Sequence, residues 1–246
     1  MDDTTEDTVL DGRVKLTQPA RGYRAGLDAA LLAAACDARP GERAIEAGCG
    51  AGAALLAAAV RRAGVSFTGV ERDPKAAALA RVNAAANDLG DRVDIVAGDV
   101  GVRFATLQLP AFDAALANPP FFDDPDSLRA VSAEKRGAWM ADDGLAAWAG
   151  FLLKAVREGG TITVIHRADR LADLLALLGA TAGSFQVRPV HPFADEPAKR
   201  VLVRAIKTGK APLKLLPPLV LHERDGGKHT AEAEAILRGR ADLPWT

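Results

Sequence analysis

Between residues 43 and 166, the sequence alternates short apolar runs that favour strands with longer runs that favour helices. The strand-like runs are RAIEAG (43–48), SFTGVE (66–71), RVDIVAG (92–98), FDAALA (112–117) and GTITVIH (160–166). The helix-like runs between them are AALLAAAVRRA (53–63), PKAAALARVNAAAND (74–88) and DDGLAAWAGFLLKAVRE (142–158). Strands that alternate with helices at this spacing form βαβ units. The alternation predicts an α/β fold with a mostly parallel sheet and helices on both faces.

The flanking segments are less regular. LDAALLAAACDA (27–38) predicts a helix that ends before Pro40, while SFQVRPVHP (184–192) and KRVLVRAI (199–206) predict two strands close enough to pair. A proline-broken stretch and a short closing helix follow. We expect residues 1–12 to be flexible and residues 13–39 to form an irregular segment plus that first helix. Since the sequence shows no linker and no repeat, we expect residues 1–246 to form a single domain.

Composition excludes several classes of protein. The net charge is −1, so a nucleic-acid site would have to be a local basic patch. Cys36 and Cys49, the only cysteines, have no histidine pair near them in sequence, so we expect neither a zinc site nor a disulfide scaffold. The start MDDTTEDTVL is unlike a secretory signal, and charges interrupt the alanine-rich runs well before the roughly 20 residues of a membrane span. We expect a cytoplasmic protein that does not enter membranes.

The first predicted strand runs into a glycine-rich turn, EAGCGAG (46–52). Glycines between a strand and a helix let the backbone approach a ligand closely, although a tight turn alone would also require them. Their spacing is G-x-G-x-G, whereas the dinucleotide-binding fingerprint is G-x-G-x-x-G. Glu46, two residues before the first glycine, would face a cationic group more readily than a pyrophosphate.

Two more acids end the next two strands. Glu71 follows SFTGV at the interval where a carboxylate reaches ribose hydroxyls, and Asp99 follows RVDIVAG. Each acid alone could be a helix cap, as we expect for Asp73 before Pro74. Together they line the edge at which open α/β sheets bind ligands. With the glycines, they fit an adenosine that carries an amino acid and a sulfonium.

The fourth strand ends in ALANPPFF (115–122), where two prolines stop the strand and two aromatics follow. An Asn-Pro pair alone more often marks a simple turn. Here the loop offers the Asn118 amide, the Asn118 and Pro119 carbonyls, and the flat face of Phe121. These groups could grip a planar molecule that bears an amine.

These motifs, in this order, resemble those of class I S-adenosylmethionine-dependent methyltransferases, in the amino-methylating branch with a (D/N)PP(Y/F) motif. The resemblance implies a Rossmann-like fold with a seven-stranded, mostly parallel sheet, and S-adenosylmethionine as cofactor. The segments KLTQPARGYRAGLDAALLAAA (15–35) and PLVLHERDGGKHTAEAEAILRG (218–239) are similar to bacterial enzymes that methylate the adenine N6 next to the anticodon of a valine tRNA. Several relatives carry tyrosine where this chain has Phe121.

The resemblance also implies roles for individual residues. Asn118, Pro119 and Phe121 would be catalytic. Glu71 would hold the ribose, Asp99 the adenine amine, and Glu46 or nearby backbone the methionine end. The full set of implied cofactor-binding residues is Gln18, Gly26, Asp28, Glu46, Gly48, Cys49, Gly50, Gly52, Glu71, Arg72, Asp99, Val100 and Asn118.

Other reactive side chains have simpler interpretations. Cys49 has no base next to it, so we expect it to be a small filler in the turn. His166 ends the fifth predicted strand and His191 follows the sixth, and we expect surface or hydrogen-bonded histidines there. No metal is implied.

The substrate is less constrained than the reaction. An unpaired adenine of structured RNA, most simply tRNA, could enter the loop without the opening of a duplex. The basic residues after the sixth strand and near the start could form an RNA track or a solvated face; they are Lys199, Arg200, Arg204, Lys207, Lys210, Lys214, Arg21 and Arg24. Alternatives are a protein glutamine, a DNA adenine, a nicotinamide-dependent oxidoreductase, and nucleotide binding without catalysis.

Overall fold

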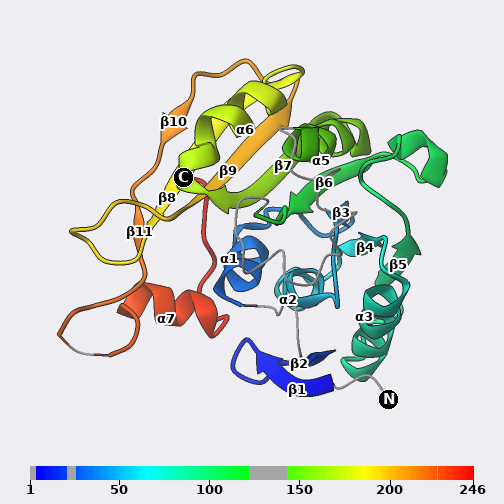
Figure 1. Cartoon of the computed structure of the whole chain (residues 1–246), viewed down its shortest axis with the longest axis horizontal. Helices are drawn as coiled ribbons and strands as arrows, with labels where there is room; N and C mark the ends of the chain where they lie inside the picture. The colour runs from blue at the N-terminus through cyan, green and yellow to red at the C-terminus, as the bar shows by residue number, and fades with distance from the viewer. Residues whose placement is uncertain (1–3, 21–25, 122–142, 226) are drawn as a thin grey trace.

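Seven strands form the centre of the sheet, in the order β8-β9-β7-β6-β3-β4-β5 (Figure 1). This computed structural model describes residues 4–20, 26–121, 143–225 and 227–246. The seven strands are β3 (Arg43–Ala47), β4 (Ser66–Glu71), β5 (Val93–Ala97), β6 (Phe112–Ala117), β7 (Val156–Arg167), β8 (Ala182–His191) and β9 (Arg200–Lys207). Strands β3 to β7 pair in parallel, whereas β9 is antiparallel to both β7 and β8. The predicted mostly parallel α/β fold is confirmed.

Two further short strands enlarge the predicted seven-stranded sheet to nine strands within the described residues. They are β10 (Lys214–Leu215) and β11 (Leu219–Val220), and both pair in parallel with β8. Pro217 and Pro218 separate them, and because proline cannot donate to a ladder, each strand is only two residues long.

The chain begins with a hairpin where we expected flexible and irregular segments. Strand β1 (Thr4–Val9) pairs antiparallel with β2 (Val14–Pro19), and Leu10, Asp11 and Gly12 adopt positive φ in the turn. The expectation for residues 1–12 was therefore wrong from Thr4 onward, because the charged side chains of β1 hide its alternating pattern and its pairing depends on β2.

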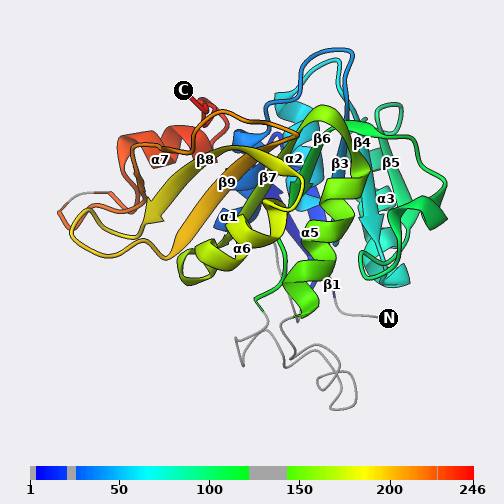
Figure 2. The ribbon, with the colours of Figure 1, turned by 90° about the horizontal axis from the view of Figure 1, so that it is seen from above.

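Helices cover both faces of the sheet. α1 (Leu27–Ala35), α2 (Ala53–Arg61) and α3 (Pro74–Ala86) pack on one face, and α5 (Asp143–Ala155) and α6 (Leu171–Leu178) pack on the other (Figure 2). Short 3-10 turns, η1 (Phe104–Leu107) and η3 (Ala168–Arg170), precede β6 and α6. α7 (Ala231–Leu237) packs against α1 near the end of the chain (Figure 1). The helix before β7 stops at Ala155, three residues earlier than predicted, because Val156 already pairs with Phe112 of β6.

Asn83 and Asn87 of α3 tie the hairpin to the rest of the fold. The Oδ1 of Asn83 accepts from Thr17 N–H at 2.8 Å, and its Nδ2 donates to the carbonyls of Thr17 and Ala51, both at 2.9 Å. Asn87, one turn later, bonds the N–H and C=O of Lys15 in the same way. The two amides act as a substitute strand along β2, and Asn83, which is buried, reaches the glycine turn as well.

The C-terminal segment is fastened to both the sheet and the hairpin. Trp245 Nε1 donates to the carbonyl of Ala35 at 2.8 Å, and the buried Arg188 donates to the carbonyl of Pro244 at 2.6 Å. Arg238 and Arg240 each lie 2.8 Å from a carboxylate oxygen of Asp11, in the turn of the hairpin. The turn of the hairpin thus contacts the residues that follow α7.

Among the described residues, no helix combines the length and the apolar character that crossing a membrane requires.

Replacing Asn83 with alanine should lower the free energy of unfolding by about 2–3 kcal/mol, because three backbone groups lose their partners in a buried place. Urea denaturation measures this change. Asn87→Ala, at the C-cap of the same helix, is the control. Its bonds to Lys15 are exposed and one further bond goes to the carbonyl of Asn83, so its cost should be about 1 kcal/mol, less than that of Asn83→Ala. Equal losses in the two variants would contradict the role given to Asn83.

Candidate active site

The carboxyl ends of the parallel strands lie abreast at one edge of the sheet. Ala47 of β3 is paired with Val70 of β4 and with Ala117 of β6, and Ala117 is paired with Val164 of β7. The glycine turn and the segment that begins at Asn118 therefore leave the sheet side by side. The predicted meeting of these motifs is confirmed at the level of the backbone.

Glycine is required in the turn after β3. Gly48, Gly50 and Gly52 have φ of 63°, 56° and 91°, and Gly52 is the N-cap of α2. A Cβ on Gly48 would lie 2.2 Å from Cη2 of Trp148, a buried side chain of α5. The turn thus passes so close to an indole that no other residue fits at this position.

Glu46 lies at the end of β3 with 3% of its surface exposed, and its Oε2 has no hydrogen-bond partner. Burial, with the negative charge of Glu71 as the second cause, raises the pKa of Glu46 well above its ordinary value; a backbone hydrogen bond from Leu55 opposes the shift. An unpartnered buried carboxyl is costly, and a cationic ligand group would relieve that cost. The Glu46 carboxyl could accept a hydrogen bond from the ammonium group of an amino acid, which is the role expected for it from the sequence.

Glu71 fixes the glycine turn from the neighbouring strand. Its Oε2 accepts from Gly50 N–H at 2.9 Å, and its Oε1 accepts from Asp73 N–H at 2.8 Å. Asp73 is the N-cap of α3, as predicted, since its side chain accepts from Lys75 N–H. Each Glu71 oxygen keeps a lone pair, so the carboxylate can also accept from ligand hydroxyls.

Asp99 stands after β5, across from Arg72 after β4. One Asp99 oxygen accepts from Gly101 N–H at 2.7 Å, and the other lies 3.7 Å from a guanidinium nitrogen of Arg72. Both side chains are partly exposed, so this ion pair is weak and a ligand could replace it.

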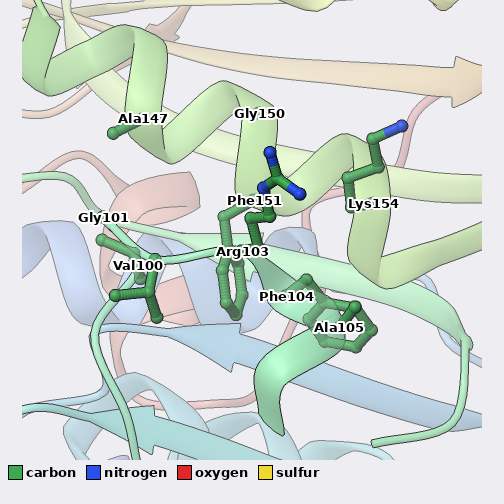
Figure 3. Close-up of a pocket in the computed structure, with 10 residues that line it drawn as sticks. Val100, Gly101, Arg103, Phe104, Ala105, Ala147, Gly150, Phe151 and Lys154 are labelled. Atoms are coloured by element: carbon green, nitrogen blue, oxygen red, sulfur yellow. The ribbon is translucent and has the colours of Figure 1, made fainter. Parts of the chain in front are cut away.

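A cavity of about 610 Å³ opens beside Asp99, between the segment after β5 and helix α5 (Figure 3). Val100, Phe104 and Phe151 give it an apolar floor, and Arg103 and Lys154 stand at its walls. Val100 was predicted to contact the cofactor. It borders this cavity, whose apolar floor could hold a planar group. Among the described residues that line it, Asn118 does not occur.

The segment after β6 presents Asn118 half-buried, Pro119 buried and Phe121 half-buried. The guanidinium carbon of Arg200 lies 4.4 Å from the centre of the Phe121 ring, and the His166 ring stands edge-to-face to it at 5.4 Å. Arg200 is held in turn by Asp28, whose carboxylate lies 3.1 Å from Nε. Phe121 is therefore fixed among side chains of three other elements. Residue 122, the second aromatic of the motif, lies outside the described residues.

The three cofactor residues predicted before the first strand occupy different positions. Gln18, near the end of β2, is buried and donates from Nε2 to Asp7 at 3.1 Å. Gly26 is the exposed N-cap of α1, with no atom within 4 Å of the place a Cβ would take. Asp28 forms the ion pair with Arg200, so it contributes to the side of the site that bears Phe121.

The sequence interpretation of Cys49 and His191 agrees with the structure, and that of His166 was wrong. Cys49 is buried, and burial together with Glu46 and Glu71 raises the pKa of its thiol, so it is a filler and not a nucleophile. His191 is half-buried and its Nδ1 lies 2.6 Å from the carbonyl of Glu196. His166 is neither exposed nor hydrogen-bonded: it is 3% exposed, and both ring nitrogens are buried without partners.

Within the basic segment 199–214, half of the predicted cations serve the fold. Arg200 pairs with Asp28, Arg204 pairs with Asp37 at 2.6 Å, and Lys207 donates to the carbonyl of Val156 at 2.7 Å. Lys199, Lys210 and Lys214 are exposed. Arg21 and Arg24 lie outside the described residues. No group of histidine, cysteine or carboxylate side chains in the described ranges is arranged to hold a metal ion.

Gly48→Ala should lower the free energy of unfolding by at least about 2 kcal/mol, because alanine is strained at this φ and its Cβ would displace Trp148. Cofactor affinity, measured by calorimetry, should fall as well. The control is Gly90→Ala, at a glycine with open space around it, where we expect a change below about 0.5 kcal/mol. Normal cofactor affinity in Gly48→Ala would refute the packing argument.

Glu46→Gln should change how stability depends on pH. Because the pKa of Glu46 is raised in the folded protein, the folded state keeps a proton that the unfolded state loses above about pH 4.5. The contribution of Glu46 to the free energy of unfolding is therefore greatest below that pH. As pH rises toward the raised pKa, this contribution falls by up to about 1.4 kcal/mol per pH unit. Urea denaturation at pH 5 and pH 8 should show a variant that gains over the wild type as pH rises. Parallel profiles for the two proteins would rule this out.

Comparison with known proteins agrees with this geometry. Residues 24–134 match the family model described as methyltransferase small domain. A tRNA1(Val) (adenine(37)-N6)-methyltransferase from Porphyromonas gingivalis is 30% identical over 202 residues, which cover 77% of this chain and 77% of that relative. A release factor glutamine methyltransferase from Caulobacter vibrioides is 30% identical over 154 residues, 59% of this chain and 52% of that relative.

The solved structure of a predicted O-methyltransferase from Agrobacterium tumefaciens superimposes with a TM-score of 0.74 at 28% identity, over 88% of this chain and 98% of that one. The family match thus spans both the glycine turn and the NPPF segment, and the superposition agrees with the fold. The chain belongs to the family of S-adenosylmethionine-dependent methyltransferases that includes the tRNA1(Val) (adenine(37)-N6)-methyltransferases.

Proposed function

We propose that this methyltransferase transfers a methyl group from S-adenosylmethionine to the exocyclic N6 amine of an adenine in RNA, most simply a tRNA. One observation carries the proposal: β6, which ends just before Asn118, lies directly beside β3, which ends just before the glycine turn. A group gripped by Asn118, Pro119 and Phe121 would therefore stand next to a cofactor held by that turn.

The cofactor-binding side fits S-adenosylmethionine through the groups already described. Glu46 offers a buried, unpartnered carboxyl oxygen to the ammonium end. Glu71 can accept from the ribose hydroxyls, and Asp99 beside Val100 can accept from the adenine amine. When bound, the cofactor supplies an electrophilic methyl group on a sulfonium. In this proposal Gln18, Gly26, Asp28 and Arg72 complete the surroundings of the site.

The substrate side supplies position and polarity. The amine of adenine is a poor nucleophile, because its lone pair is delocalised into the ring. Asn118 Oδ1 and the Pro119 carbonyl can accept its two hydrogens and so favour the tetrahedral geometry that exposes the lone pair. Phe121 can stack on the base and hold it in line with the methyl group. No side-chain base is needed for this step.

RNA is favoured over protein and DNA by the relatives that share most of the chain. The relative that covers 77% of the chain is named for tRNA adenine N6, whereas the glutamine methyltransferase covers 59% of it. The exposed Lys199 precedes Arg200, which is paired with Arg167 at the carboxyl end of β7, so it could contact a phosphate beside the site. The exposed Lys210 and Lys214 lie farther away, beyond the other end of β9 and on β10. A tRNA substrate would place the enzyme in the cytoplasm, and we propose that the whole chain acts as one methyltransferase domain.

Asn118→Ala should lower the rate of methyl transfer by roughly 100-fold, about 3 kcal/mol of transition-state stabilisation, while cofactor affinity stays near that of the wild type. The measurement is transfer from labelled S-adenosylmethionine into bulk bacterial RNA, DNA and protein, followed by nucleoside and amino-acid analysis. Asn118→Asp is the matched control, because it keeps the accepting oxygen and should retain more activity than Asn118→Ala.

Label in tRNA as N6-methyladenosine, lost in Asn118→Ala, would support the proposal. Label in protein glutamine or in DNA would keep the site and overturn the RNA substrate. An alanine variant as active as the wild type would refute the role of the loop.

A further inference from the structure

His166 is a buried polar side chain in contact with the NPPF segment, and the proposed reaction does not use it. It lies at the end of β7, two residues beyond Val164, just as Pro119 lies two residues beyond Ala117, and these two strands are paired. Its ring is 5.4 Å from the Phe121 ring, at an interplanar angle of 77°. The imidazole therefore stands against the aromatic that would receive the base.

Both ring nitrogens of His166 are buried, and within the part of the chain that the structure describes neither has a hydrogen-bond partner. By contrast, Nδ1 of His191 and Nδ1 of His222 each lie 2.6 Å from a backbone carbonyl. Leaving a buried donor and a buried acceptor unpaired is costly, so such a side chain in a native fold calls for a partner, either an ordered water or a ligand that binds later.

The imidazole is neutral at physiological pH. Burial, reinforced by the charges of Arg170, Arg167 and Arg200, lowers the pKa of His166 to about 4, with Asp169 acting in the opposite direction. A neutral imidazole has one N–H donor and one acceptor nitrogen. It can thus donate to an uncharged heteroaromatic nitrogen, and it does not attract phosphate as a cation would.

Arg200 restricts where a base can enter. Its guanidinium lies over the Phe121 ring at 4.4 Å and is held by Asp28 at 3.1 Å. One ring face is already covered by this cation, so a base must stack elsewhere on Phe121. His166 stands edge-to-face to Phe121, so it would face the rim of a base stacked on that aromatic. Because both of its ring nitrogens are buried, the base would have to displace the groups that now cover them.

We propose that His166 is a specificity-determining residue, whose ring N–H donates a hydrogen bond to a ring nitrogen beside the exocyclic amine of the target adenine. This inference rests on the proposed function, in which Asn118 and Pro119 already take both hydrogens of that amine. The ring nitrogens beside the amine, N1 and N7, are acceptors in adenine, whereas N1 of guanine carries a hydrogen. A donor directed at N1 would favour adenine over guanine.

The test combines variants with atom-substituted RNA. Methyl transfer is measured with tRNA fragments that carry adenosine, 1-deazaadenosine, 7-deazaadenosine or 3-deazaadenosine at the methylated position, using the wild type and His166→Phe. In the wild type, either the 1-deaza or the 7-deaza base should lower kcat/KM for RNA by about tenfold more than the 3-deaza base does. In His166→Phe, which keeps an aromatic contact with Phe121, kcat/KM for adenosine should fall about tenfold and this extra sensitivity should disappear.

The affinity for S-adenosylmethionine should be unchanged in His166→Phe, which separates a role in base recognition from a general loss of structure. His191→Phe is the control. It makes the same substitution at the end of β8, two strands away from β7, and should keep the wild-type kcat/KM. If His166→Phe does not fold, the deaza series on the wild type still decides: equal rates with the 1-deaza, 7-deaza and 3-deaza bases would overturn the inference.

The outcomes also separate the two proposals. A wild type that methylates RNA adenine, with His166→Phe equally active, would overturn only the role of His166. A wild type that methylates no RNA adenine would overturn the proposed function, and the role of His166 with it.

Discussion

The close contact between the glycine turn and its neighbours is the constraint on which the site depends. Trp148 of α5 presses against Gly48, Glu71 holds Gly50, and Asn83 binds the carbonyl of Ala51. Elements from both faces of the sheet thus fix one five-residue turn. Because a turn with left-handed residues has little regular structure of its own, these outside contacts define its shape. The turn in turn determines where Glu46 and the start of α2 stand.

Much of the fold could be predicted because it follows from local patterns in the sequence. The alternation of apolar strands and alanine-rich helices is strong between residues 43 and 117, and the chemistry-bearing motifs stand at strand ends, where a parallel sheet must bring them together. The hairpin and the strands β10 and β11 could not be predicted in this way. They are short or charged, and they exist because an existing strand or the amides of α3 offer them a partner.

The misjudged residues in the site share one physical cause. The sequence shows that His166 ends a strand, but burial depends on Phe121 and on the elements that pack over it. Likewise, Arg204 belongs to a run of cations, yet it pairs with Asp37, which lies 167 residues earlier in the chain. Charge patterns along a sequence show which cations are near one another, whereas their availability to a ligand depends on acids contributed from elsewhere.

The ion pairs between Asp11 in the hairpin turn and two arginines after α7 affect the order in which the protein folds during synthesis. Asp11 leaves the ribosome well before its partners Arg238 and Arg240, which follow it by 227 and 229 residues. Since chains emerge from the N-terminus, the sheet and its helices can gather before this connection exists. The turn of the hairpin that carries Gln18 can therefore form its ion pairs only after Arg238 and Arg240 have been synthesised. The central sheet can assemble before that contact forms.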